Sequence, residues 1–135
     1  MARVVVTGGS GKLGRVVVAE LVEHGWEVHN LDLAAPREPV CPHTRVDLTD
    51  YGQVVEALTG IDDRYQGLDA VVHLAAIPGP GVAGNAATFA NNVPATYNIF
   101  AASRRDERRC VAGQSRSSGV WSASRSRNAV AKALR

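Results

Sequence analysis

The stretch Thr7-Gly8-Gly9-Ser10-Gly11-Lys12-Leu13-Gly14 directly follows the apolar run Val4-Val5-Val6 near the start of the chain. An apolar-periodic segment then continues through Leu21 and Val22. This order predicts a strand, a tight glycine turn and the start of a helix. Glycines in such a turn permit positive φ, let the backbone approach a pyrophosphate and let the helix pack closely on the strand. Because a helix N-terminus presents unpaired N–H groups and a partial positive charge, the stretch predicts a phosphate-binding turn.

The spacing of the glycines is a weaker signal than their position. Three of them recur as Gly8-x-x-Gly11-x-x-Gly14, and a glycine-rich turn without a ligand would show the same spacing. Their place at the first junction between a predicted strand and a predicted helix favours phosphate binding over that alternative.

A carboxylate ends the second predicted strand. Asp32 directly follows residues 27–31 and lies 18 residues after Gly14. A carboxylate at this place can accept hydrogen bonds from the hydroxyls of an adenosine ribose. It would also repel a 2′-phosphate, which favours NAD over NADP, although the nearby Arg37 weakens that preference. A solvated carboxylate at a strand end is the alternative.

Strand and helix patterns alternate up to about residue 103. The predicted strands are 3–7, 27–31, 44–46 and 68–76, and the predicted helices are 11–24, 51–58 and 86–105. Residues 34–42 and 60–67 are expected to be loops. The side chains expected on the apolar sides of the first and third helices include Leu13, Val16, Val17, Phe89, Val93 and Tyr97. The order of elements predicts an α/β fold, a Rossmann-like doubly wound parallel sheet.

Two further strand ends carry candidate site residues. The fourth predicted strand ends in small residues after Leu74, at Ala75 and Ala76, which leave room for a dinucleotide across the sheet. Asp47 follows the third predicted strand and could reach an adenine amino group, while a turn-forming aspartate is an equal alternative. His73 is expected to be a packed strand residue rather than a catalyst.

Composition bounds the class of protein. The 135 residues suggest one domain, and no apolar run has the length of a signal-peptide core or a membrane span. Cys41 and Cys110 form no cluster with histidines, so neither a zinc site nor a disulfide framework is expected. We therefore predict a reduced, cytoplasmic protein with no metal and no membrane partner.

The charge changes sign at residue 104. Residues 1–103 carry six Lys/Arg and eleven Asp/Glu, whereas residues 104–135 carry nine Lys/Arg and two Asp/Glu. We predict a Rossmann domain over 1–103 and a poorly ordered basic Ser/Arg/Ala-rich tail over 104–135, with the sheet truncated after the fourth strand and third helix. An out-of-frame tail is the favoured interpretation, ahead of a genuine short C-terminus. A nucleic-acid-binding arm is least favoured, because Trp121 is the only aromatic residue of the tail.

Five motifs occur in a familiar order. They are the glycine stretch, Asp32, Asp47-Leu48-Thr49, His73-Leu74-Ala75-Ala76 and Asn92-Val93-Pro94-Ala95-Thr96-Tyr97-Asn98. Together they resemble the N-terminal part of the extended short-chain dehydrogenase/reductases, the NAD-dependent epimerase/dehydratase family. The resemblance covers about residues 1–103 and implies NAD as the cofactor, with NADP disfavoured. The cofactor-binding residues that it implies are Gly8, Ser10, Gly11, Lys12, Leu13, Gly14, Asp32, Asp47, Leu48, Leu74, Ala75, Ala76, Asn91 and Asn92.

The resemblance also implies a role for each part of this set. The glycine turn would hold the pyrophosphate and Asp32 the adenosine ribose. Asp47 and Leu48 would flank the adenine, and residues 74–76 would line the cofactor bed. Asn91 or Asn92 would lie near the nicotinamide-side ribose or brace the central strands.

The catalytic pair of the family is absent from this chain. Its chemistry depends on a tyrosine and a lysine four residues apart, in which the tyrosine is the acid/base and the lysine lowers the tyrosine pKa. The residues four positions after Tyr51, Tyr65 and Tyr97 are Val55, Asp69 and Ala101. No catalytic residue is therefore predicted.

The expected function is the NAD(P)-binding domain of an epimerase-, dehydratase- or dehydrogenase-type oxidoreductase acting on a sugar-like hydroxyl, inactive as this chain stands. The alternative is a non-catalytic dinucleotide-sensing or regulatory module with a basic partner-binding tail. The expected partners are NAD(P) and, in the intact parent, a sugar-like small molecule. An open sheet edge would also favour association of copies into a homo-oligomer.

Overall fold

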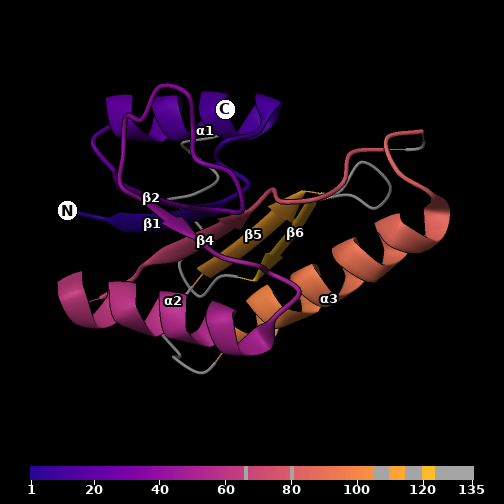
Figure 1. The fold of residues 1–135 in the computed structure, drawn as a ribbon. Coiled ribbons are helices and arrows are strands. Elements are labelled where there is room, and N and C mark those ends of the chain that lie inside the picture. Colours follow the sequence, from indigo (N-terminus) through magenta and orange to yellow (C-terminus); the bar gives the residue numbers. More distant parts are fainter. Residues whose placement is uncertain (66, 80, 105–109, 115–119, 124–135) are drawn as a thin grey trace.

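The computed structural model describes residues 1–65, 67–79, 81–104, 110–114 and 120–123. The elements in chain order are β1 (Arg3–Thr7), α1 (Lys12–Glu23), β2 (Glu27–Asp32), β3 (His43–Arg45), α2 (Tyr51–Tyr65), β4 (Ala70–His73), α3 (Asn85–Ser103), β5 (Cys110–Gln114) and β6 (Val120–Ala123). They form three layers, with α1 on one face of the sheet and α2 and α3 on the other (Figure 1).

The sheet has the order β3-β2-β1-β4-β5-β6. Every neighbouring pair is parallel except β5 and β6, which are antiparallel. The chain runs outward from β1 through β2 to β3 and then crosses to β4 on the other side. This is the predicted Rossmann-like doubly wound sheet, and its strand order reverses between β1 and β4, where such folds bind ligands.

The prediction that the sheet ends at the fourth strand is wrong. β5 pairs in parallel with β4, and β6 pairs with β5. Without β5, the outer edge of the central strand β4 would present unpaired N–H and C=O groups. The strand β5 was not predicted because its apolar run, Cys110-Val111-Ala112, is short and lies within an arginine- and serine-rich segment. The other residues of the predicted tail lie outside the described part of the chain.

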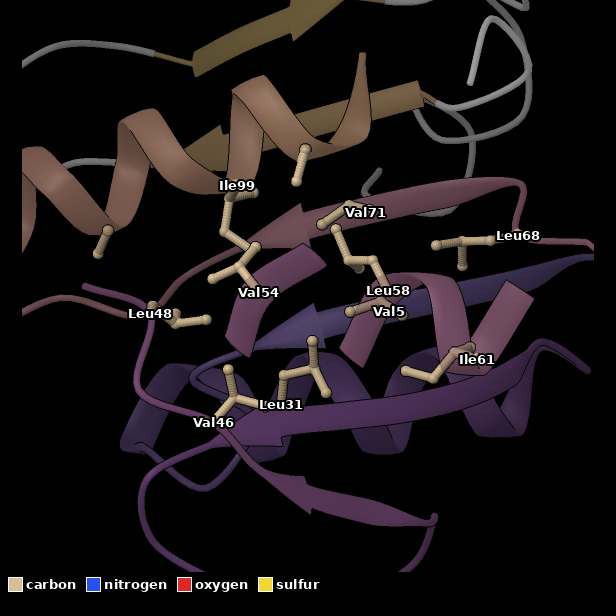
Figure 2. Packing of buried hydrophobic residues seen from close by; sticks show 12 residues of the cluster. Val5, Leu31, Val46, Leu48, Val54, Leu58, Ile61, Leu68, Val71 and Ile99 are labelled. Carbon is tan, nitrogen blue, oxygen red and sulfur yellow. The ribbon is translucent and has the colours of Figure 1, made fainter. Parts of the chain in front are cut away.

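Two apolar clusters lie on opposite faces of the sheet. Val5, Leu31 and Val71 meet residues of α2 and α3 such as Leu58 and Ile99 (Figure 2). The neighbouring strand positions, including Val4, Val6, Val28 and Val72, meet Val18 and Leu21 of α1. Because both faces are covered, the central strands β1 and β4 contain continuous apolar runs rather than alternating ones, as the valine run predicts.

The buried side of α1 differs from the predicted one. Gly14, Val18 and Leu21 are buried, at the helical spacing that faces the sheet. Leu13 and Val16 are 50% and 61% exposed, so the prediction that they form the packed side is wrong. The predicted stop of the helix near residue 25 is confirmed. Gly25 has φ +80°, and the N–H groups of residues 25 and 26 donate to the carbonyls of residues 22 and 21, a Schellman motif.

The second helix is longer than predicted. It continues through the predicted loop to Tyr65, because Val54, Leu58 and Ile61 form one buried row and their packing outweighs the low helix propensity of Gly60. At its start, Asp50 Oδ1 accepts a hydrogen bond from the Gln53 N–H at 3.1 Å. This N-cap lowers the pKa of Asp50, mainly through that backbone N–H.

The third helix presents the opposite side from the one expected. Phe89 and Tyr97 are 69% and 70% exposed, and Val93 is also exposed. The buried side instead comprises Ala95, Asn98, Ile99, Ala102 and Ser103. Four of these five buried residues are small or polar, and the fifth, Ile99, is a large apolar side chain that is fully buried. The helix is a single element, Asn85–Ser103, with Pro94 inside it.

Candidate functional site

The glycine turn joins β1 to α1 at the point where the strand order reverses. Gly8 has φ +72°, and its N–H donates to the Leu31 carbonyl at 2.9 Å. A Cβ on Gly8 would lie 2.6 Å from the Ala75 nitrogen, and a Cβ on Gly14 would lie 1.9 Å from the Gly8 oxygen. The turn is therefore packed backbone against backbone on both the segment after β4 and the helix, in agreement with the positive φ and the close helix packing expected of the glycines.

The N-terminus of α1 is open to an anion. Among the described residues no side chain caps it, and its first turn contains no acidic residue. Lys12 and Leu13, which begin the helix, are exposed. The first N–H groups of a helix have no carbonyl partner within it, and they carry the positive end of the dipole. This end of the helix therefore fits a phosphate group.

Asp32 lies beside this turn at the end of β2. Its two carboxylate oxygens accept hydrogen bonds from the Ser10 N–H at 3.1 Å and the Ala34 N–H at 3.3 Å. Ser10 Oγ donates to the Ala34 carbonyl at 2.6 Å and accepts from Asn30 Nδ2 at 3.0 Å. The structure thus brings Ser10 and Asp32 together, with the carboxylate partly accessible. Asn30 was missed by the sequence analysis; its signal was a lone amide inside a buried strand.

The loop after β3 contains Asp47 and Leu48. Asp47 Oδ1 accepts hydrogen bonds from the Thr49 N–H at 2.9 Å and its hydroxyl at 2.7 Å, so the turn-forming role is present. The Leu48 side chain lies in the core at 6% exposure. The Leu48 and Thr49 carbonyls accept hydrogen bonds from Asn98 Nδ2, which ties this loop to α3. A direct contact with adenine stays a prediction for both residues.

The loop after β4 is held by an asparagine. Asn92 Oδ1 accepts hydrogen bonds from the Ile77 N–H at 2.8 Å and from Asn91 Nδ2 at 2.9 Å, and Asn92 Nδ2 donates to the Ile77 carbonyl at 3.2 Å. Asn92 therefore braces the segment that follows Ala76. The bracing predicted for the asparagine pair was of the central strands, whereas Ile77 lies in the loop after β4. Contact with a ribose stays a prediction.

His73 is packed, as predicted. It is 5% exposed, and burial lowers its pKa to about 4. Its ring nitrogens are hydrogen-bonded to Thr7 Oγ1 at 2.7 Å and Thr96 Oγ1 at 3.1 Å. The ring is therefore neutral near pH 7 and lies within the fold rather than at the surface.

The low pKa predicts an acid-sensitive fold. Between about pH 6.5 and pH 4 the unfolded chain binds a proton at His73 that the folded chain does not, so the free energy of unfolding falls as the pH falls. We expect His73 to contribute a loss of about 3 kcal/mol at pH 4, with its full stability present above pH 6.5. Urea unfolding of the wild type and of His73→Asn across this range measures the contribution, because other groups such as His29, whose pKa is also lowered by burial, are common to both proteins. If the free energy of unfolding fell equally steeply with pH in the two proteins, the predicted contribution of His73 would be contradicted.

Two other kinds of site were sought in the described part of the chain. No group of three or more His, Cys, Asp or Glu side chains there could hold a metal ion. None of the helices over the described residues has the length and apolar character needed to cross a membrane.

Comparisons with known proteins agree with this geometry. Residues 4–130 match the model of the NAD dependent epimerase/dehydratase family, which extends past residue 103, where the sequence resemblance was expected to end. An L-arabinose 1-dehydrogenase (NAD(P)(+)) from Haloferax volcanii is 32% identical over 102 residues, covering 76% of this chain and 36% of that protein. A 3 beta-hydroxysteroid dehydrogenase/Delta 5-->4-isomerase from Mycobacterium tuberculosis is 33% identical over 110 residues, covering 78% and 29%.

A solved structure shows the same likeness. The UDP-glucose 4-epimerase of Thermus thermophilus, in complex with NAD, is 33% identical with a TM-score of 0.64, covering 76% of this chain and 34% of that one. The chain thus spans about a third of the length of these relatives. Because the family model matches residues 4–130, nearly all of the chain, the protein belongs to the NAD-dependent epimerase/dehydratase family.

Proposed function

We propose that this chain binds NAD across the carboxyl ends of β1, β2 and β4. The observation that carries the proposal is the uncapped N-terminus of α1, held directly against the turn through Gly14, with the Asp32 carboxylate beside it. Relatives solved with NAD support it. When bound, the nicotinamide supplies a hydride acceptor or donor.

The residues of the site divide this work. The N–H groups of Lys12, Leu13 and Gly14 bind the pyrophosphate. Asp32 accepts hydrogen bonds from the adenosine ribose hydroxyls, and its charge disfavours a 2′-phosphate. Ala75 lets the dinucleotide lie close to the sheet.

Calorimetric titration of the chain with NAD and with NADP tests this function. We expect NAD to bind more tightly than NADP, and Asp32→Asn to weaken NAD binding about tenfold while narrowing the difference between the two cofactors. The matched control is Asp63→Asn, which removes an exposed carboxylate of α2. Absence of any heat or thermal shift at millimolar NAD would contradict the proposal.

We further propose that the larger protein is an oxidoreductase acting on a sugar-like hydroxyl. The names of the L-arabinose dehydrogenase and UDP-glucose epimerase relatives support this class. The present chain has no tyrosine followed four residues later by a lysine, so we expect no turnover from it. NADH formation from aldoses such as L-arabinose, followed by absorbance, checks this, and a steady rate would overturn it.

A second candidate is a dinucleotide-sensing module of the cytoplasm. Residues 104–135 contain nine basic and two acidic residues. This positive net charge favours the second candidate, because a basic segment attracts anionic partners. Salt-sensitive binding of single-stranded RNA that is lost when residues 115–135 are deleted would support it. Sedimentation velocity on the same samples tests the predicted association of copies.

A further inference from the structure

A chain of buried hydrogen bonds links β1, β4 and α3 directly beneath the proposed cofactor bed. Thr7 is fully buried and pairs with His73 in the β1–β4 register. The Thr7 hydroxyl lies 2.7 Å from His73 Nδ1, and His73 Nε2 lies 3.1 Å from the Thr96 hydroxyl.

The donors and acceptors of this chain can be assigned by counting. Thr7 Oγ1 accepts hydrogen bonds from the backbone N–H groups of Leu74 at 3.2 Å and Ala75 at 3.3 Å. The Leu74 N–H is shared with the Thr7 carbonyl, which lies 3.1 Å away. A hydroxyl has two lone pairs and one proton, so its proton is left for His73 Nδ1. A neutral ring that accepts at Nδ1 carries its proton on Nε2, which donates to Thr96. The Thr7 hydroxyl is thereby assigned as the donor to Nδ1 of His73, and Nε2 of His73 as the donor to Thr96.

The hydrogen bonds of Thr7 connect the two halves of the proposed cofactor bed, the glycine turn and the segment that follows β4. Thr7 immediately precedes Gly8, where the pyrophosphate turn begins, and its hydroxyl holds the N–H groups of Leu74 and Ala75 at the end of β4. The same Ala75 nitrogen would be 2.6 Å from a Cβ on Gly8. A shift of a few tenths of an ångström at this point therefore changes the spacing between the turn and β4.

We propose that Thr7, His73 and Thr96 are positioning residues for the nicotinamide half of the dinucleotide, setting the distance between the pyrophosphate turn and the end of β4. This inference rests on the proposed binding of NAD. The adenosine half would lie over β2 and Asp32, whereas the hydrogen bonds of His73 join β1 to β4 and α3. Loss of the chain should therefore weaken binding of the whole dinucleotide and leave binding of its adenylate half nearly unchanged.

The test compares NAD with AMP by calorimetry on the full chain. His73→Phe keeps a ring and removes both hydrogen bonds; we expect NAD to bind about tenfold more weakly and AMP within about twofold of the wild type. Thr96→Val removes only the outer bond and should weaken NAD about threefold. His73→Asn retains an acceptor for the Thr7 hydroxyl and should recover part of the loss. Thr59→Val, at an exposed position of α2, is the control.

Each outcome is decisive. Parallel losses for NAD and AMP in His73→Phe and Thr96→Val would make the chain merely structural and overturn the proposal, as would unchanged NAD binding in a folded variant. If His73→Phe does not fold, Thr96→Val alone decides through its NAD-to-AMP ratio. Failure of the wild type to bind NAD overturns the proposed function itself and is distinguished by the wild-type titration. The ¹⁵N shifts of the His73 ring provide an independent reading, because a proton on Nδ1 would contradict the assigned chain.

Discussion

Replacing Gly14 with alanine is expected to weaken NAD binding about 100-fold and to lower the free energy of unfolding by about 2–3 kcal/mol. The added Cβ would lie 1.9 Å from the Gly8 oxygen and 2.6 Å from the Gly9 Cα, so the helix must move away from the turn. That movement withdraws the first N–H groups of α1 from the pyrophosphate. Calorimetry with NAD and urea unfolding measure the two effects on the same samples.

Gly60→Ala is the matched control. Gly60 also lies within a helix, but a Cβ there would have no neighbour within 4 Å in the described structure. Alanine is the better helix former, so this change should leave NAD binding unaltered and stabilise the fold by about 0.5–1 kcal/mol. A Gly14→Ala protein that binds NAD within threefold of the wild type would falsify the packing argument.

The second large effect is expected at Arg3. Its Nη1 donates to the Tyr65 and Gly67 carbonyls, both at 2.7 Å, and so caps the C-terminus of α2 from the first strand. Its other terminal nitrogen pairs with Glu27, and its guanidinium carbon lies 4.7 Å from the centre of the Tyr65 ring. Arg3→Met should lower the free energy of unfolding by about 3 kcal/mol, because carbonyls and a partly buried carboxylate lose their donor.

Two further substitutions sharpen the Arg3 experiment. Arg3→Lys keeps the charge but not the planar fork, so it should recover only part of the loss. Arg15→Met changes an exposed arginine of α1 and should stay within about 0.5 kcal/mol of the wild type. Equal free energies of unfolding for Arg3→Met and Arg15→Met would show that the contacts of Arg3 contribute little to stability.

The first four strands could be predicted because local chemistry determines them. Valine runs, the glycine turn and Asp32 all act through neighbours in sequence, and the structure places them as expected. β5 could not be predicted in this way, since a strand in an arginine-rich segment is stabilised by the free edge of β4 rather than by its own composition.

The buried sides of α1 and α3 were predicted wrongly for a related reason. Hydrophobicity alone assigned Phe89 and Tyr97 to the buried side, whereas the side of α3 that packs against the core carries Ala95, Ile99 and Ala102. In the site, the turn and Asp32 followed from spacing. The Thr7–His73–Thr96 chain depends on pairing between strands 66 residues apart, which no local pattern reveals.

The two hydrogen bonds that Asp32 already accepts have a consequence for the speed and selectivity of binding. Because Ser10 and Ala34 fix the carboxylate, little rotamer entropy remains to be lost when a ribose arrives. A carboxylate fixed in this way offers the two ribose hydroxyls a single acceptor geometry. It cannot change rotamer to make room for a bulkier group without losing its bonds to Ser10 and Ala34. The part of the site around Asp32 should therefore bind the adenosine without a preceding conformational change.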